Sequence, residues 1–78
     1  MNFLKDKVKK YQEKKLAEAE EKLKFYTLAK TRLEKQLELT NDEEFKRIKK
    51  EIEKHQEFIG IWKNNVASIN KQIKKLNH

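Results

Sequence analysis

The chain has 78 residues and contains no cysteine, no proline and a single glycine. Because cysteine is absent, neither a disulfide nor a zinc–thiolate site can hold the fold together. No apolar run reaches transmembrane length, and the first ten residues lack the apolar core of a signal peptide. These absences predict a soluble, cytoplasmic protein with a single domain over residues 1–78.

Residues suited to catalysis are also scarce. Ser68 is the only serine and has no companion base, and there is no glycine-rich phosphate loop. We therefore expect no enzyme, no cofactor and no concave pocket. A metal site has little support, because di-metal carboxylate bundles use Glu-x-x-His and the residue three before His55 is Ile52.

A regular apolar pattern occupies residues 45–76, in a chain with 42% charged residues. The pattern has alternating spacings of three and four, and its positions are Phe45, Ile48, Ile52, His55, Ile59, Trp62, Val66, Ile69, Ile73 and Leu76. A period of 3.5 residues predicts a helix that packs along its whole length against another helix. We call such positions, on both helices, the seam.

The first half of the chain has the same spacing. Its seam positions are Leu16, Ala19, Leu23, Tyr26, Lys30, Leu33, Leu37 and Thr40. Towards residue 1, the face continues through Gln12 to Val8, which requires a four-residue stutter in the heptad pattern. The first helix is therefore expected to pack against the second over most of its length.

The seam changes phase by one residue near Asn41, so a single unbroken helix would shift its apolar row sideways there. Asn41 with Glu44 fits a helix-capping box, and so does Thr40 with Glu43. The sequence thus predicts an all-α fold, an antiparallel two-helix hairpin of the coiled-coil type. We expect the helices over residues 3–39 and 43–77 and the turn over residues 40–42.

The register of the hairpin follows from the position of the turn. It sets Ala19, the smallest seam residue of the first helix, opposite Trp62, the largest of the second. It also sets Tyr26 opposite His55, which we expect to bond to that phenol or to Gln56 of a neighbouring chain. Tyr26 and His55 form a candidate pH-sensitive core pair, because a histidine in a seam resists charging.

Five apolar residues outside the seam are expected to converge on one flank. We call them the patch: Phe25, Leu28, Ala29, Phe58 and Ile61. An exposed cluster of this kind predicts an association site. Its partner is either a second copy, giving a homodimeric four-helix bundle, or a different protein docking on the helix face. Self-association is favoured, because a thin hairpin needs the additional burial.

Positive charge gathers near both ends of the sequence. Residues 1–15 contain six lysines and two acids, residues 60–78 contain four lysines and no acid, and the span between has a net charge of −1. A hairpin brings the two basic segments together into a region that we call the basic end. Its candidate phosphate contacts are Lys5, Lys9, Lys10, Lys14, Lys63, Lys71, Lys74 and Lys75. Sequence-specific reading of bases is not expected, because Arg32 and Arg47, the only arginines, lie elsewhere.

The sequence favours a small, non-enzymatic interaction or regulatory protein, a self-associating hairpin that binds a protein partner of unspecified identity. The alternative is a non-specific nucleic-acid-binding protein that uses the basic end. Attachment of the basic amphipathic residues 1–15 to an anionic membrane surface is the least favoured of the three interpretations.

Overall fold

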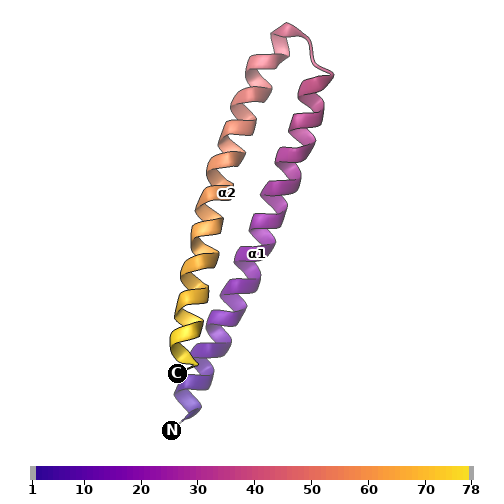
Figure 1. Ribbon diagram of the computed structural model, residues 1–78. Coiled ribbons are helices and arrows are strands. Elements are labelled where there is room, and N and C mark those ends of the chain that lie inside the picture. Colours follow the sequence, from indigo (N-terminus) through magenta and orange to yellow (C-terminus); the bar gives the residue numbers. More distant parts are fainter. Residues whose placement is uncertain (1, 78) are drawn as a thin grey trace.

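The computed structural model describes residues 2–77, which form two long helices joined by a short turn. Helix α1 spans Asn2–Glu38 and helix α2 spans Asp42–Leu76. The helices run antiparallel, so the first turns of α1 and the last turns of α2 lie at the same end of the molecule (Figure 1). The predicted all-α hairpin is therefore confirmed, with each helix boundary one residue earlier than expected.

The turn between the helices is fixed by Asn41, the N-cap of α2. Its backbone is extended (φ −82°, ψ 173°), and its side-chain oxygen accepts a hydrogen bond of 3.2 Å from the backbone N–H of Glu44. In a complete capping box, the Glu44 carboxylate would accept a hydrogen bond from the backbone N–H of Asn41. Here the carboxylate instead pairs with Arg47, whose Nε donates to it at 2.9 Å. This hydrogen bond, together with the negative charge of Glu44, raises the pKa of Arg47. Thr40, the other candidate cap, instead donates its hydroxyl to the Gln36 carbonyl at the end of α1.

The seam forms the contact between α1 and α2. Between Leu16 and Leu76, all of its predicted members except Phe45 are buried or half-buried, and the buried ones are Ala19, Ile48 and Ile59. Phe45 lies beside the turn and is 43% exposed. The rings of Tyr26 and His55 meet edge-on with centroids 6.0 Å apart, as the predicted register requires. The core is thus a single narrow row of side chains.

Towards the open end, the seam departs from the sequence-based expectation. Lys9 and Gln12 are half-buried and continue the three-four spacing from Leu16, whereas Val8 is 45% exposed. The predicted stutter through Val8 is therefore wrong, and the heptad register is unbroken. Lysine is tolerated at position 9 because its apolar stem packs while its ammonium reaches water. The valine is left on the outer surface of α1.

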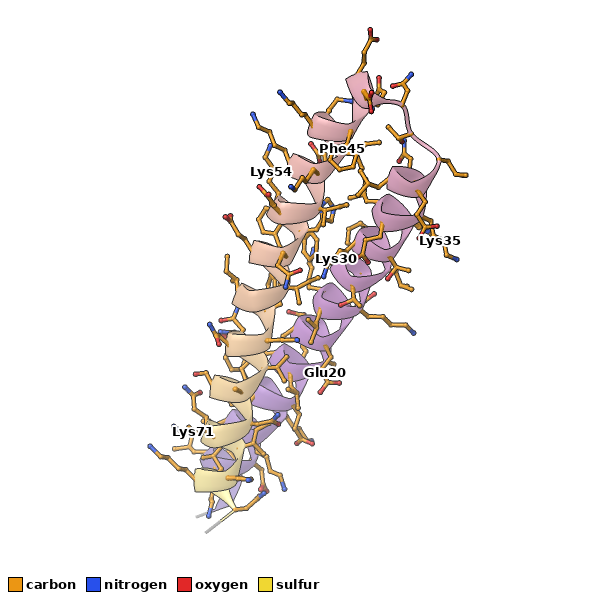
Figure 2. All side chains as sticks on the ribbon, turned by 45° about the horizontal axis from the view of Figure 1, so that its top comes forward. Glu20, Lys30, Lys35, Phe45, Lys54 and Lys71 are labelled. Atoms are coloured by element: carbon orange, nitrogen blue, oxygen red, sulfur yellow. The ribbon has the colours of Figure 1, made fainter. Side chains whose placement is uncertain are left out.

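The hairpin is a thin rod. It measures 63 × 14 × 13 Å, and its radius of gyration is 17.8 Å, compared with about 11–12 Å for a compact domain of this length. Its accessible surface is 6728 Å², whereas a compact protein of 9.5 kDa exposes about 5,000 Å². Charged side chains, including Glu20, Lys35, Lys54 and Lys71, point away from the helix pair (Figure 2). One seam therefore leaves a large share of the surface in water.

Gly60 lies in the middle of α2, where a methyl group on its Cα would meet no atom within 4 Å. No contact within the hairpin therefore requires glycine at this position. We predict that Gly60→Ala raises the free energy of unfolding by about 1 kcal/mol, because alanine favours the helix and restricts the unfolded chain. Thermal unfolding followed by circular dichroism should show Tm higher by about 4–8 °C. A lower Tm would contradict this prediction and would indicate that another chain approaches Gly60 closely.

Candidate functional site

The two long flanks of the hairpin differ in chemistry. In an antiparallel pair, the heptad e positions of both helices share one flank and the g positions share the other. The e positions are exposed and polar, namely Asp6, Glu13, Glu20, Thr27 and Glu34 in α1 and Lys49, Gln56, Lys63 and Asn70 in α2. The g flank and the adjoining c positions carry most of the patch. Only the g flank therefore presents large apolar side chains to solvent midway along the rod.

The patch residues are largely exposed in a single hairpin. Phe25 is 62% exposed, Leu28 50%, Phe58 41% and Ile61 53%, while Ala29 is half-buried. Isolated apolar side chains on a surface are ordinary, but a contiguous cluster that includes two phenylalanines is typical of a contact surface. This flank is the candidate functional site.

The ring of Tyr26 connects the patch to the seam. It meets Phe25 edge-on with centroids 5.3 Å apart, and it stacks on Phe58 at 5.0 Å with an interplanar angle of 27°. Aromatic pairs of this geometry contribute about 0.5–1.5 kcal/mol beyond their buried area. Two phenylalanines from different helices are therefore held against one half-buried tyrosine, which presents them as an ordered surface.

An open groove of about 520 Å³ lies beside this aromatic cluster. Its lining consists of Phe25, Leu28, Ala29, Arg32 and Leu33 from α1 and of Glu51 and His55 from α2. Three patch residues thus share the groove, and Phe58 adjoins it through Tyr26. Ile61 lies one turn beyond Phe58 on α2 and is not part of the lining, so it marks the margin of the surface.

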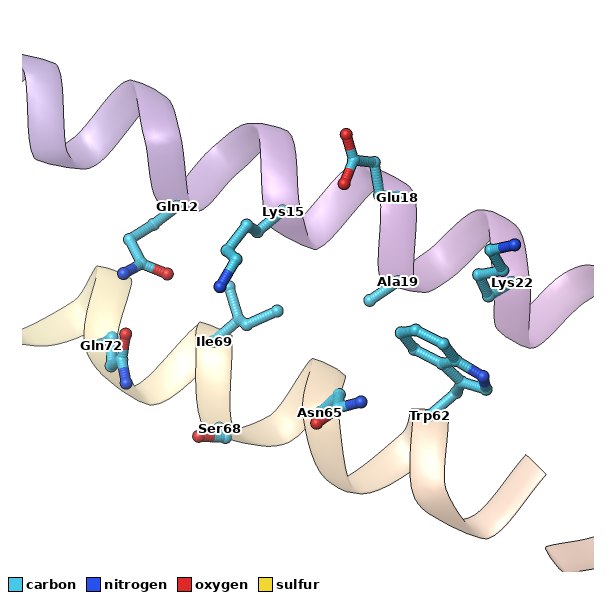
Figure 3. A pocket seen from close by; sticks show the side chains of 10 residues that line it. All are labelled: Gln12, Lys15, Glu18, Ala19, Lys22, Trp62, Asn65, Ser68, Ile69 and Gln72. Carbon is cyan, nitrogen blue, oxygen red and sulfur yellow. The ribbon is translucent and has the colours of Figure 1, made fainter. Parts of the chain in front are cut away.

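A second groove, of about 450 Å³, follows the same flank towards the open end (Figure 3). In it, the Ala19 methyl group faces the Trp62 indole, as the predicted register requires, and the short side chain of Asn65 lies on the next turn of α2 and leaves the indole partly uncovered. The expectation of no concave pocket was therefore wrong. The sequence signal was available, because short side chains beside the Ala19–Trp62 pair leave open space on that flank.

His55 is held by its own helix. Its Nδ1 lies 2.7 Å from the Glu51 carbonyl oxygen. Since a carbonyl only accepts, this contact places an N–H on Nδ1. The bond expected to the Tyr26 phenol is therefore replaced by a bond to the backbone, and the two rings meet only through their edges. The pH sensitivity of this pair remains a prediction.

The basic end is open to solvent. Seven of its eight candidate phosphate contacts are exposed, and Lys9 is half-buried in the seam. Lys71, Lys74 and Lys75 lie on the last turns of α2, beside the first turns of α1, whereas Lys63 lies farther towards the turn. Within residues 2–77, no three potential ligand side chains gather into a metal site. In the same span, neither helix is long and apolar enough to cross a bilayer.

We predict that Tyr26→Ala lowers the free energy of unfolding by about 2–3 kcal/mol, because it removes the ring that contacts Phe25, His55 and Phe58. The matched control is Tyr11→Ala, which removes the same group from a position that is 56% exposed and outside the seam. Its cost should stay below about 1 kcal/mol. Urea denaturation measures both variants. Equal losses would contradict a structural role for the Tyr26 cluster.

Comparison with known proteins does not connect this hairpin to a characterised one. No family model matches the chain, and neither the curated proteins nor the solved structures give a match. A two-helix hairpin is compatible with many functions, so the fold alone does not define one. The residues and geometry of the exposed flank therefore carry the functional argument.

Proposed function

We propose that this protein is a non-enzymatic interaction module that acts by self-association. Two hairpins pack flank to flank through the patch and form a four-helix bundle, and this assembly binds or regulates a protein partner. The observation that carries the proposal is the exposed aromatic patch on one flank of a rod whose other flank is polar at every described e position.

The surface area of the single hairpin supports association. It exposes 6728 Å², which is roughly 1,700 Å² more than a compact protein of its mass. A stable dimer interface buries about 1,200–2,000 Å² in total, half from each partner. Packing two hairpins along the patch would thus bury about half of the excess accessible surface of each copy. The other half would stay available to a further partner.

The charges beside the patch are self-complementary. The groove at Leu28 is lined by one base, Arg32, and one acid, Glu51. In an interface with two-fold symmetry, each contact occurs twice with the roles exchanged. Each copy brings one base and one acid to the interface, so the covered surface carries no net charge from Arg32 and Glu51 in either orientation of the dimer.

The basic end favours one orientation of the dimer. Residues 1–15 and 60–78 each carry a net charge of +4, and the hairpin collects both at its open end. With the turns at the same end of the bundle, the two basic ends would lie together and repel one another. With the turns at opposite ends, they are separated. We therefore expect the second arrangement.

Phe58→Glu tests the patch, because it places a charge where the second copy would exclude water. We expect the dissociation constant of the dimer to rise by about a hundredfold or more. Gln56→Glu introduces the same charge on the opposite flank and should leave the dimer intact, since Gln56 is an exposed e position. Sedimentation velocity over a range of concentrations measures both variants, and circular dichroism monitors their fold.

Leu28→Glu provides a second test, because Leu28 is 50% exposed and is not one of the rings that pair with Tyr26. It should dissociate the dimer without loss of helix. A wild-type protein that sediments as a monomer at every concentration would overturn the proposal. So would patch variants that sediment like Gln56→Glu.

Orientation can be measured with a spin label at Leu39→Cys, because the chain contains no other cysteine and Leu39 is 90% exposed beside the turn. Leu39 lies about 16 Å along α1 from Leu28. With the two-fold axis at the patch and the turns at opposite ends, the labels should be separated by about 33 Å or more along the bundle. A distance under about 20 Å by pulsed electron resonance would instead place the turns together.

A further inference from the structure

A second set of exposed apolar side chains lies on the first turns of α1. We call it the stripe: Phe3, 70% exposed, Leu4, 73%, Val8, 45%, and Tyr11, 56%. Leu4, Val8 and Tyr11 follow one another at spacings of four and three, so they share one face of the helix. The seam does not use them, because Lys9 and Gln12 occupy its positions in this segment.

The stripe is separate from the patch, although both lie on the same side of α1. Between them, this side carries the charged residues Lys15, Glu18 and Lys22, which line the groove at Trp62. The distance from Tyr11 to Phe25 along the helix is about 21 Å. The hairpin therefore has two apolar surfaces, and one does not continue into the other.

The charge around the stripe has a single sign. Lys7 Nζ lies 4.9 Å from the ring centroid of Phe3, and Lys15 Nζ lies 5.2 Å from that of Tyr11. Lys14 adds a third exposed ammonium to this segment. The only acids among residues 1–15 are Asp6 and Glu13, and both occupy e positions on the opposite flank. The face shared by Leu4, Val8 and Tyr11 thus combines apolar side chains with nearby ammonium groups, and its first carboxylate is Glu18, two turns beyond Tyr11.

We propose that the stripe and its lysines bind an anionic lipid surface, with the first turns of α1 in the plane of the headgroups. A helix of this kind buries its apolar face at the boundary between headgroups and acyl chains, while its lysines meet the lipid phosphates. The ammonium groups of Lys7 and Lys15 already lie over the aromatic rings of the stripe, so positive charge and apolar surface stand side by side on the first turns of α1.

The aliphatic members of the stripe favour lipid over nucleic acid as the ligand. A phosphate backbone would attract the lysines, but it would leave Leu4 and Val8 in water. Only a surface with anionic groups above an apolar interior engages both kinds of side chain. The binding rests on the geometry of α1 and does not require the hairpin to self-associate.

Co-sedimentation with two kinds of vesicle tests the proposal: phosphatidylcholine alone, and phosphatidylcholine mixed with phosphatidylglycerol. We expect binding to the mixed vesicles only. The double variant Leu4→Gln/Val8→Gln should lower the partition coefficient by about tenfold or more, because it removes apolar burial while keeping good helix formers. The triple variant Lys7→Gln/Lys14→Gln/Lys15→Gln should lower it on the order of a hundredfold, at about fivefold for each lysine.

The matched control is Leu39→Gln, which removes an exposed leucine at the opposite end of the rod, 90% exposed, and should bind as wild type does. Absence of binding to the mixed vesicles would overturn the proposal. It would also be overturned if Leu4→Gln/Val8→Gln bound as tightly as wild type, because lysines alone would then account for the attraction. A parallel titration with duplex DNA identifies a site that binds any polyanion through its lysines. Such a site binds the duplex equally with and without the Leu4→Gln/Val8→Gln change.

Discussion

The narrow seam between α1 and α2 is the constraint on which the rest of the structure depends. Two straight helices share one row of side chains, and of residues 2–77 only Ala19, Ile48 and Ile59 are buried in it. Any large apolar side chain off this row has no place inside a single hairpin. The patch and the stripe are therefore exposed because the fold has two helices rather than three or four. Burial of these side chains requires association with another molecule.

The architecture could be predicted because the seam repeats the same information many times. Eight positions in the first half and ten in the second agree on one period, so no single residue decides the outcome. The pairing of Ala19 with Trp62 follows from this register and from close packing. The choice between alternative hydrogen-bond partners was harder to predict. Glu44 binds Arg47 instead of completing the capping box, and His55 binds the Glu51 carbonyl instead of the Tyr26 phenol.

Residues near the open end show why hydrophobicity alone is an incomplete guide. Side-chain hydrophobicity predicts that Val8 lies in the seam, whereas the structure places Lys9 there. A continuous register along the helix outweighs the burial of one valine, and the lysine stem supplies apolar contact at little cost. The candidate site was predictable as a set of exposed residues on one flank. Its grooves and ring stacking depend on side-chain directions, which spacing along the sequence does not give.

The distribution of charge decides which apolar surface can meet its own copy. The groove at the patch has one base, Arg32, and one acid, Glu51, on its lining, so covering it with a second copy would bury no net charge from these groups. The segment that carries the stripe, residues 1–15, contains six lysines and only two acids, so two stripes would repel one another. Both surfaces expose large apolar side chains, and the proposed association of two copies uses the one whose groove is lined by one base and one acid. The partner proposed for the stripe is instead a surface that carries negative charge above an apolar interior.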